Sequence, residues 1–121
     1  MLKLSRTYDE CRQGFRWEVP RSYNIGVDIC DKWASDRYRV ALISEVPGEG
    51  VERYTFWDFR NFSNKLANGL TAYGIQRGDR VGILLGQSPE TAISHIAIYK
   101  IGAIAIPLFT LFGVDALQYR L

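Results

Sequence analysis

The turn that follows the apolar run at residues 80–85 contains residue types that could hold a phosphate group. Gly86 stands directly after the run, and Ser88, Pro89 and Glu90 follow it. A phosphate loop needs several glycines or a Lys-Ser/Thr pair, so that backbone N–H groups converge on the anion. This turn has neither. Ser suits a helix N-cap, Pro the first helical position and Glu the first turn, so the pattern predicts a helix start, although an anion can bind at any helix N-terminus.

Five other side chains could carry chemistry, and each lacks the partners that a site requires. His95 has no second histidine at a metal-ligand spacing, and Ser88 has no GxSxG frame. Lys100 lies near the predicted end of a helix, where its charge complements the helix dipole and its chain can extend to solvent. Cys11 and Cys30 have no CxxC spacing, which favours two reduced thiols over a disulfide or a zinc site.

The bulk composition is typical of one folded domain. The chain has 121 residues, 47% of them hydrophobic, and a formal net charge of +2. Its basic residues are scattered, which gives no support for a nucleic-acid or polybasic membrane surface. The apolar stretch at 91–112 contains His95, Lys100, Gly102 and Pro107, so a helix followed by a strand fits it better than a membrane span. The N-terminus carries charges throughout and does not resemble a signal peptide, and we expect a cytoplasmic protein.

The first part of the chain predicts an arm and a helix. Residues 1–23 are polar and aromatic without a clear period, so we expect an irregular arm that Phe15 and Trp17 pack down. Asn24 is a favoured capping residue and predicts a helix over 25–36.

A β-hairpin and a capped helix are predicted next. An apolar strand at 40–46 and a second strand at 51–55 flank the PGEG turn at 47–50. Thr55 and Asp58 then have the Ser/Thr-x-x-acid spacing of a capping box. The helix that starts there is predicted to run over 56–73, with Gly74 where a helix stops. Its apolar stripe comprises Phe59, Phe62, Leu66, Leu70 and Tyr73.

The last part predicts a βαβ unit. Strand 81–85 has no polar alternation, so we expect it to be covered on both faces. A helix over 89–101 ends at Gly102, and a second apolar strand covers 103–108. This order implies parallel pairing with a right-handed crossover, and a final helix begins near 114. The residues that the middle helix should bury are Ile93, Ile96, Ala97 and Ile101.

Three segments in this order resemble the beginning of the AMP-forming acyl-CoA synthetases of the adenylate-forming superfamily. They are YTFWDFRNFSNKLANGL, GDRVGILLGQSPE and YKIGAIAIPLFTLFGVDALQYRL, and the resemblance covers residues 15–121 in register. The leading FRWEVPRSYNIGVDICDKWA is most similar to the acetyl- and medium-chain acyl-CoA synthetase branch. The resemblance implies an α/β fold, in which residues 1–121 are an N-terminal fragment of the large AMP-binding domain. An arm at about 1–23 would precede a core at 24–121, built from a helix, a β-hairpin and βαβ units of a parallel sheet with covering helices.

The same resemblance implies a parent enzyme that activates a carboxylic acid with ATP and Mg²⁺ and passes the acyl-adenylate to CoA. The family's phosphate loop, its adenine- and ribose-binding segments and its catalytic lysine do not occur in this sequence. We therefore expect no catalytic or metal-binding residue here, no cofactor bound by these residues alone, and dependence on the remainder of the synthetase chain. In acetyl-CoA synthetases the loop after the second strand lies near the CoA channel, which places Phe109, Thr110 and Leu111 there by resemblance. Relatives often have glycine where Thr110 and Leu111 stand.

Two other functions stay open at this point. One is a free-standing α/β module that binds a nucleotide or CoA, and the other is an interaction fragment of a split enzyme. In each case strands 81–85 and 103–108 have only the helices at 25–36, 56–73 and 89–101 to cover them. We expect exposed apolar surface, unpaired strand edges and self-association.

Overall fold

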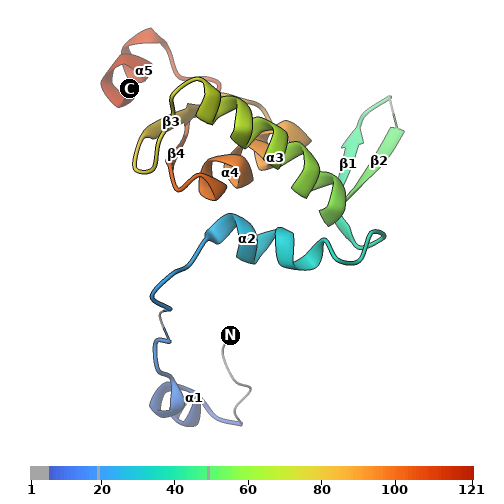
Figure 1. Cartoon of the computed structure of the whole chain (residues 1–121), viewed down its shortest axis with the longest axis vertical. Coiled ribbons are helices and arrows are strands. Elements are labelled where there is room, and N and C mark those ends of the chain that lie inside the picture. Colours follow the sequence, from blue (N-terminus) through green and yellow to red (C-terminus); the bar gives the residue numbers. More distant parts are fainter. Residues whose placement is uncertain (1–5, 19, 49) are drawn as a thin grey trace.

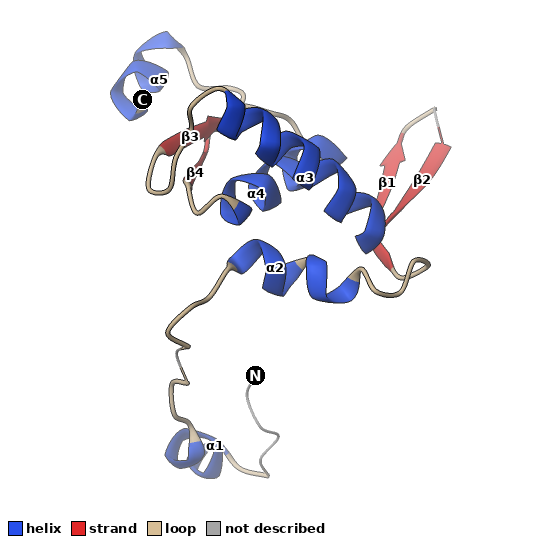
Figure 2. Cartoon of the chain, viewed as in Figure 1, coloured by secondary structure: helices blue, strands red, loops and turns tan. Residues whose placement is uncertain are grey.

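The structure is a computed structural model, and it describes residues 6–18, 20–48 and 50–121. Figures 1 and 2 show how its helices and strands follow one another. The elements are α1 (Tyr8–Gly14), α2 (Ile25–Ile29), the 3-10 helix η1 (Asp31–Trp33), β1 (Val40–Val46), β2 (Gly50–Thr55), α3 (Phe56–Ala72), β3 (Arg80–Ile83), α4 (Pro89–Lys100), β4 (Ile104–Pro107) and α5 (Val114–Arg120). The predictions made for residues 1–5, for Val19 and for Glu49 of the hairpin turn lie outside the described residues.

The strands form two sheets of two strands each. β1 and β2 pair antiparallel, and β3 and β4 pair parallel with α4 as the connection. Both the predicted hairpin and the predicted βαβ unit are therefore confirmed. β3 ends at Ile83, two residues before the end of the predicted strand 81–85. The ladder stops there, where the Ile83 carbonyl accepts a hydrogen bond from the N–H of Leu108 at 2.9 Å. Pro107 has no N–H with which to extend the pairing.

Helix α3 starts and stops at the predicted signals. The Thr55 hydroxyl accepts from the N–H of Asp58 at 3.2 Å, and the Asp58 carboxylate accepts from the N–H of Thr55 at 2.9 Å. This is the complete reciprocal capping box. Gly74 follows the helix with φ +95°, and Gly102 follows α4 with φ +73°. Glycine tolerates these left-handed conformations, which explains both stops.

The buried stripe of α3 differs from the predicted one. Phe59 is buried as expected, but the other buried positions are Ser63 and Ala67, which continue the row at four-residue steps. The prediction of a core role was wrong for Tyr73, which is 92% exposed, and for Phe62, which is 44% exposed. Small side chains along the row allow α3 and α4 to approach closely, so the contact forms there and not along the aromatic stripe.

Helix α4 is the centre of the packing. Figure 1 shows it between α2 and α3, and it also contacts β3 and β4. Ile96 belongs to a core cluster with Cys30 and Phe59. Ile98 belongs to a second cluster with Ile83 and other residues at the sheet. The predicted burial of Ile96 and of the neighbouring alanine is confirmed, while the flanking isoleucines at 93 and 101 are half-buried.

The N-terminal arm is more ordered than predicted. Thr7 caps α1 by accepting from the N–H of Glu10 at 3.3 Å, and the Glu10 carboxylate accepts from the N–H of Arg6 at 3.1 Å. This is a capping-box spacing that the prediction of an irregular arm overlooked. Phe15 and Trp17 do not pack the arm down, because they stack edge-to-face on each other at 4.9 Å and Trp17 is 83% exposed.

The predicted helix over 25–36 breaks after one turn. Asn24 caps α2 as expected, accepting from the N–H of Val27 at 3.1 Å. The chain then leaves helical geometry at Cys30, which has φ −126° and ψ −65°, and continues as η1. Three β-branched residues in α2 make a long helix here costly, and Asp31 gains a buried partner by turning inward.

That partner is Lys100, the last residue of α4. Its ammonium lies 2.6 Å from the Asp31 carboxylate and donates to the side-chain oxygen of Asn64 at 2.7 Å and to the carbonyl of Arg60 at 3.4 Å. The Asn24 side chain donates to the Lys100 carbonyl at 2.9 Å. The Lys100 side chain is only 8% exposed, so the predicted extension to solvent was wrong. These bonds fasten α2 and η1 to α3 and α4.

We predict that Lys100→Met lowers the free energy of unfolding by about 2–4 kcal/mol, because the substitution leaves the largely buried Asp31 carboxylate without its cationic partner. Urea denaturation measures this change. Lys32→Met is the matched control, since Lys32 pairs with Asp28 on the exposed side of the same segment and should change the stability little. Equal losses in the two variants would contradict this account of Lys100.

Candidate functional site

The carboxyl ends of β3 and β4 and the start of α4 surround an open hollow of about 350 Å³. Its lining comprises Ile83, Leu85, Gly86, Gln87, Thr91, His95, Pro107, Leu108, Phe109 and Thr110. Ligands of open α/β sheets bind outside the carboxyl ends of the parallel strands, so this is the expected position for a site. The mixture of apolar walls with a few polar groups suits a small organic ligand.

A polar row along α4 supplies part of this lining. Gln87, Thr91 and His95 lie four residues apart, and Tyr99 continues the row. The Nδ1 atom of His95 lies 3.3 Å from the Tyr99 hydroxyl, which fixes the ring, and the Thr91 hydroxyl donates to the carbonyl of Gly86. This row was not predicted from the sequence, although its four-residue spacing is visible there.

The start of α4 has the features of a helix cap and not of a phosphate cradle. Ser88 occupies the N-cap with extended backbone and Pro89 follows, as predicted, but the Ser88 side chain accepts no capping hydrogen bond from a backbone N–H of the helix. The backbone of Gly86 does not have positive φ. A hydrogen bond from Ser88, and then one from its own backbone, hold the pKa of Glu90 below its ordinary value. The first turn therefore carries a carboxylate, which disfavours a bound anion.

The three residues assigned to the CoA channel by resemblance separate into two groups. Phe109 and Thr110 line the hollow. Leu111 is outside the lining and is 80% exposed. Phe109 also stacks edge-to-face on Phe112 at 5.9 Å, which supports the loop after β4. The structure thus brings two of the predicted residues together with the row on α4.

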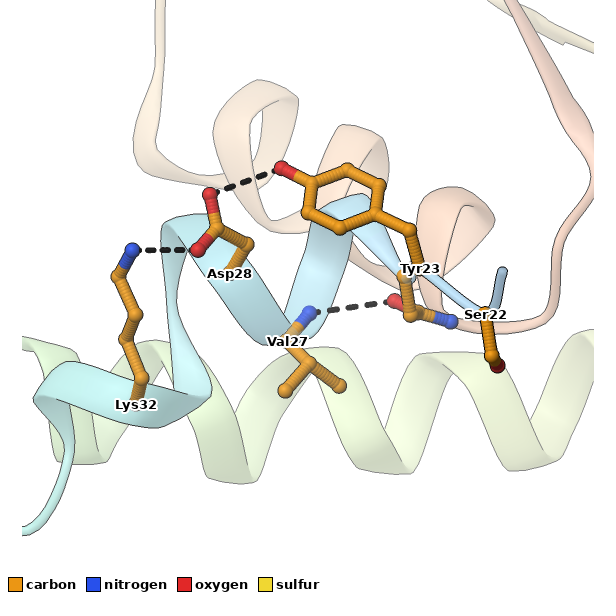
Figure 3. Close-up of a pocket in the computed structure, with 6 residues that line it drawn as sticks. Ser22, Tyr23, Val27, Asp28 and Lys32 are labelled. Atoms are coloured by element: carbon orange, nitrogen blue, oxygen red, sulfur yellow. Dashed lines mark hydrogen bonds and ion pairs between the residues drawn. The ribbon is translucent and has the colours of Figure 1, made fainter. Parts of the chain in front are cut away.

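A second, more open hollow of about 290 Å³ lies beside α2 (Figure 3). Tyr23 donates to the Asp28 carboxylate at 2.8 Å, and Lys32 pairs with the same carboxylate from the other side. The hydrogen bond from Lys32, and then that from Tyr23, hold the pKa of Asp28 below its ordinary value. Because these polar groups satisfy one another, we assign them to the local structure of α2.

The two cysteines have different surroundings. Cys30 is fully buried, and its thiol lies 3.8 Å from the carbonyl of Phe56. Burial raises the pKa of the Cys30 thiol to about 11; the charge of Lys100 lowers it to a smaller extent, and Asp31 raises it further. Cys11 is half-buried on α1, and neither thiol is bonded to another. A buried thiol with a raised pKa is a poor nucleophile, so Cys30 serves packing.

The part of the chain that the structure describes contains no group of three or more His, Cys, Asp or Glu side chains placed to hold a metal ion. Among the same residues, none of the helices has the length and apolar character needed to cross a bilayer.

Comparison with known proteins identifies the class to which this fold and hollow belong. The family described as AMP-binding enzyme matches residues 30–121. The chain is 32% identical over 121 residues to the mitochondrial acyl-coenzyme A synthetase ACSM3 of Rattus norvegicus, covering 94% of this chain and 21% of that protein. It is 36% identical over 109 residues to the acetyl-coenzyme A synthetase of Rhodobacter capsulatus, covering 88% and 17%.

A solved structure agrees with these sequence matches. The crystal structure of the Brucella canis acyl-CoA synthetase superposes with a TM-score of 0.78 at 35% identity, covering 83% of this chain and 18% of that one. The chain belongs to the AMP-binding enzyme family. The predicted resemblance and the predicted α/β fold class are both confirmed. The chain spans about a fifth of the length of the curated relatives it matches.

We predict that Cys30 reacts with iodoacetamide at pH 8 at least about a hundredfold more slowly than Cys11, because a pKa near 11 leaves few thiolates and burial blocks access. Mass spectrometry of the Cys11→Ser variant follows the Cys30 thiol alone, and unfolding in urea should raise its reaction rate. Equal rates for the two thiols in the native chain would refute the burial argument.

The raised pKa of Cys30 also predicts a pH dependence of stability. Between pH 9.0, the ordinary pKa, and pH 11 the folded chain retains the thiol proton while the unfolded chain loses it. The free energy of unfolding should therefore fall as the pH rises through this range.

Proposed function

We propose that this chain is the N-terminal segment of the large domain of an AMP-forming acyl-CoA synthetase, and that it builds walls of the active site without contributing reacting groups. The whole enzyme would activate a carboxylic acid with ATP to an acyl-adenylate and transfer the acyl group to CoA. The observation that carries the proposal is the superposition on the Brucella canis acyl-CoA synthetase at 35% identity over 83% of this chain. The remainder of the synthetase chain would be its covalent partner.

The hollow at the ends of β3 and β4 is the part of this segment that would meet a substrate. We assign Phe109 and Thr110 to one wall of the CoA channel, since both line the hollow beside His95. Thr110 stands where relatives of the acetyl-CoA synthetase branch often have glycine, so the wall is narrower here. Leu111 is 80% exposed and lies outside the lining, so we leave it out of this wall.

The described residues do not fit a nucleotide phosphate or Mg²⁺. The first turn of α4 presents Glu90, and no cluster of candidate metal ligands occurs in the described ranges. We therefore propose that ATP and Mg²⁺ are held by the remainder of the synthetase, and that residues 1–121 alone are inactive. The domain core would comprise residues 24–121, with the N-terminal arm preceding it. Two unpaired thiols accord with a cytoplasmic location.

A chimera tests this proposal. Residues 1–121 replace the equivalent segment of the Brucella canis acyl-CoA synthetase, and the product is assayed for pyrophosphate release and for acyl-CoA. We expect both activities in the chimera and neither in the isolated chain, because the chain supplies scaffold only. An inactive but folded chimera would argue against the proposal. Pyrophosphate release by residues 1–121 alone, or heat released when ATP or CoA is added to them, would favour a free-standing module.

The channel assignment has its own test in the same chimera. Thr110→Trp should raise the KM for CoA by about tenfold or more and leave acid-dependent ATP–pyrophosphate exchange unchanged, because it narrows the hollow without touching the adenylation step. Leu111→Trp is the matched control and should change neither, since its side chain lies outside the hollow. A Thr110 variant that affected exchange and thioester formation equally would remove residue 110 from the channel.

A further inference from the structure

The hollow at the carboxyl ends of β3 and β4 is lined by uncharged groups. Its polar side chains are the Gln87 amide, the Thr91 and Thr110 hydroxyls and the His95 imidazole, and the other lining residues are apolar or glycine. Among the described residues that line it, none is Asp, Glu, Lys or Arg. A phosphate or a carboxylate would find no cationic side chain there. A neutral chain that carries amide groups between methylene groups matches this mixture better.

The two ring nitrogens of His95 have different surroundings. Nδ1 lies 3.3 Å from the hydroxyl of Tyr99, which stands one turn further along α4 and outside the lining of the hollow. Nε2 forms no hydrogen bond with another described residue, and it is not among the buried polar atoms of these residues that lack a partner. Nε2 is therefore accessible. Since His95 lines the hollow, Nε2 is the nitrogen that a bound ligand can reach.

The contact with Tyr99 selects one tautomer of the neutral His95 ring. Only one of the two nitrogens of a neutral imidazole carries a proton, and the hydrogen bond that one nitrogen makes decides the state of the other. A phenol hydroxyl is a stronger donor than a neutral imidazole N–H, so we expect the Tyr99 hydroxyl to donate to Nδ1. Nε2 then carries the proton and presents an N–H donor to the hollow.

We propose that His95 is a positioning residue for the acyl acceptor. Its Nε2–H donates a hydrogen bond to an amide carbonyl in the flexible arm of CoA, and Tyr99 holds the ring in the required tautomer. This inference rests on the proposed function, which makes CoA the acceptor. The arm of CoA is a neutral chain of methylene and amide groups that ends in the thiol, so it fits the uncharged lining. A hydrogen bond that fixes the arm aligns the thiol for attack.

Nuclear magnetic resonance of the chain tests the tautomer directly, because His95 is the only histidine in the sequence. At about pH 8.5, where an ordinary imidazole is neutral, proton–nitrogen correlation spectra of an untagged chain should show a proton on Nε2 and none on Nδ1. Tyr99→Phe should give a mixture of the two tautomers. Tyr119→Phe is the matched control, since Tyr119 is 88% exposed, and it should leave the spectrum unchanged. A ring protonated on Nδ1, or the same spectrum in Tyr99→Phe, would overturn the inference.

The chimera with the Brucella canis synthetase tests the ligand. His95→Leu should raise the KM for CoA about fivefold or more and leave acid-dependent ATP–pyrophosphate exchange unchanged, because one hydrogen bond to the arm is lost. Acyl transfer to ethanethiol, a thiol without amide groups, should not change. His95→Gln should restore most of the affinity for CoA, since a glutamine amide can donate from near the position of Nε2.

The outcomes distinguish this inference from the proposed function. An active chimera whose KM for CoA is unchanged by His95→Leu would remove the role of His95 and leave the proposed function intact. Equal losses with CoA and with ethanethiol would do the same, because such a loss does not depend on an amide. A chimera that releases no pyrophosphate and makes no acyl-CoA would count against the proposed function, and the assignment of CoA to this hollow would fail with it.

Discussion

The burial of α4 on several sides at once is the constraint on which the rest of the structure depends. Ile96, Ala97 and Ile98 are consecutive and all buried. Successive residues of a helix point about 100° apart, so three in a row require cover around more than half of the circumference. A single neighbouring layer cannot provide this. The cover comes from α3, from α2 and from the β3–β4 sheet, and each approaches by a different means. The sheet is tied to α4 by the short βαβ connections, and α3 packs through Ser63 and Ala67.

Both backbone geometry and charge constrain the contact between α2 and α4. A Cβ atom on Gly26 would lie 2.6 Å from Cγ of Lys100 and 3.0 Å from the carbonyl of Ile96, so only glycine permits this contact. The same contact covers the Lys100 side chain, whose ammonium then pairs with the largely buried Asp31 carboxylate and donates to Asn64 at the edge of the site. At the carboxyl end of α4, the Lys100 ammonium and carbonyl are therefore both bonded to other parts of the chain. The amino end of α4 opens on the hollow, where Thr91 and His95 are part of the lining.

This division fits a segment that shapes a site and leaves the reaction to other parts of an enzyme. Wall-forming residues need a rigid frame more than they need perturbed ionisation. The strongly raised pKa in the described residues belongs to Cys30, which is enclosed in the core, and its cause is burial. The hollow instead combines hydroxyl, amide and imidazole groups with apolar walls, which is a surface for binding and orientation.

The sequence by itself determined the features that depend on a few neighbouring residues. The capping box at Thr55, the stop at Gly74 and the hairpin are fixed by local hydrogen bonding and by permitted backbone angles, and α1 was predictable from the same spacing at Thr7. Tertiary structure alone decided which positions meet. The periodicity of α3 identified an apolar stripe but not the neighbour that would bury it, so Tyr73 was misplaced. A lysine near a helix end is ordinarily solvated, and only the arrival of α2 from distant sequence buried Lys100. The strand–helix–strand order predicted the pairing of β3 with β4, but only the folded structure shows that Thr110 and His95 line the same hollow.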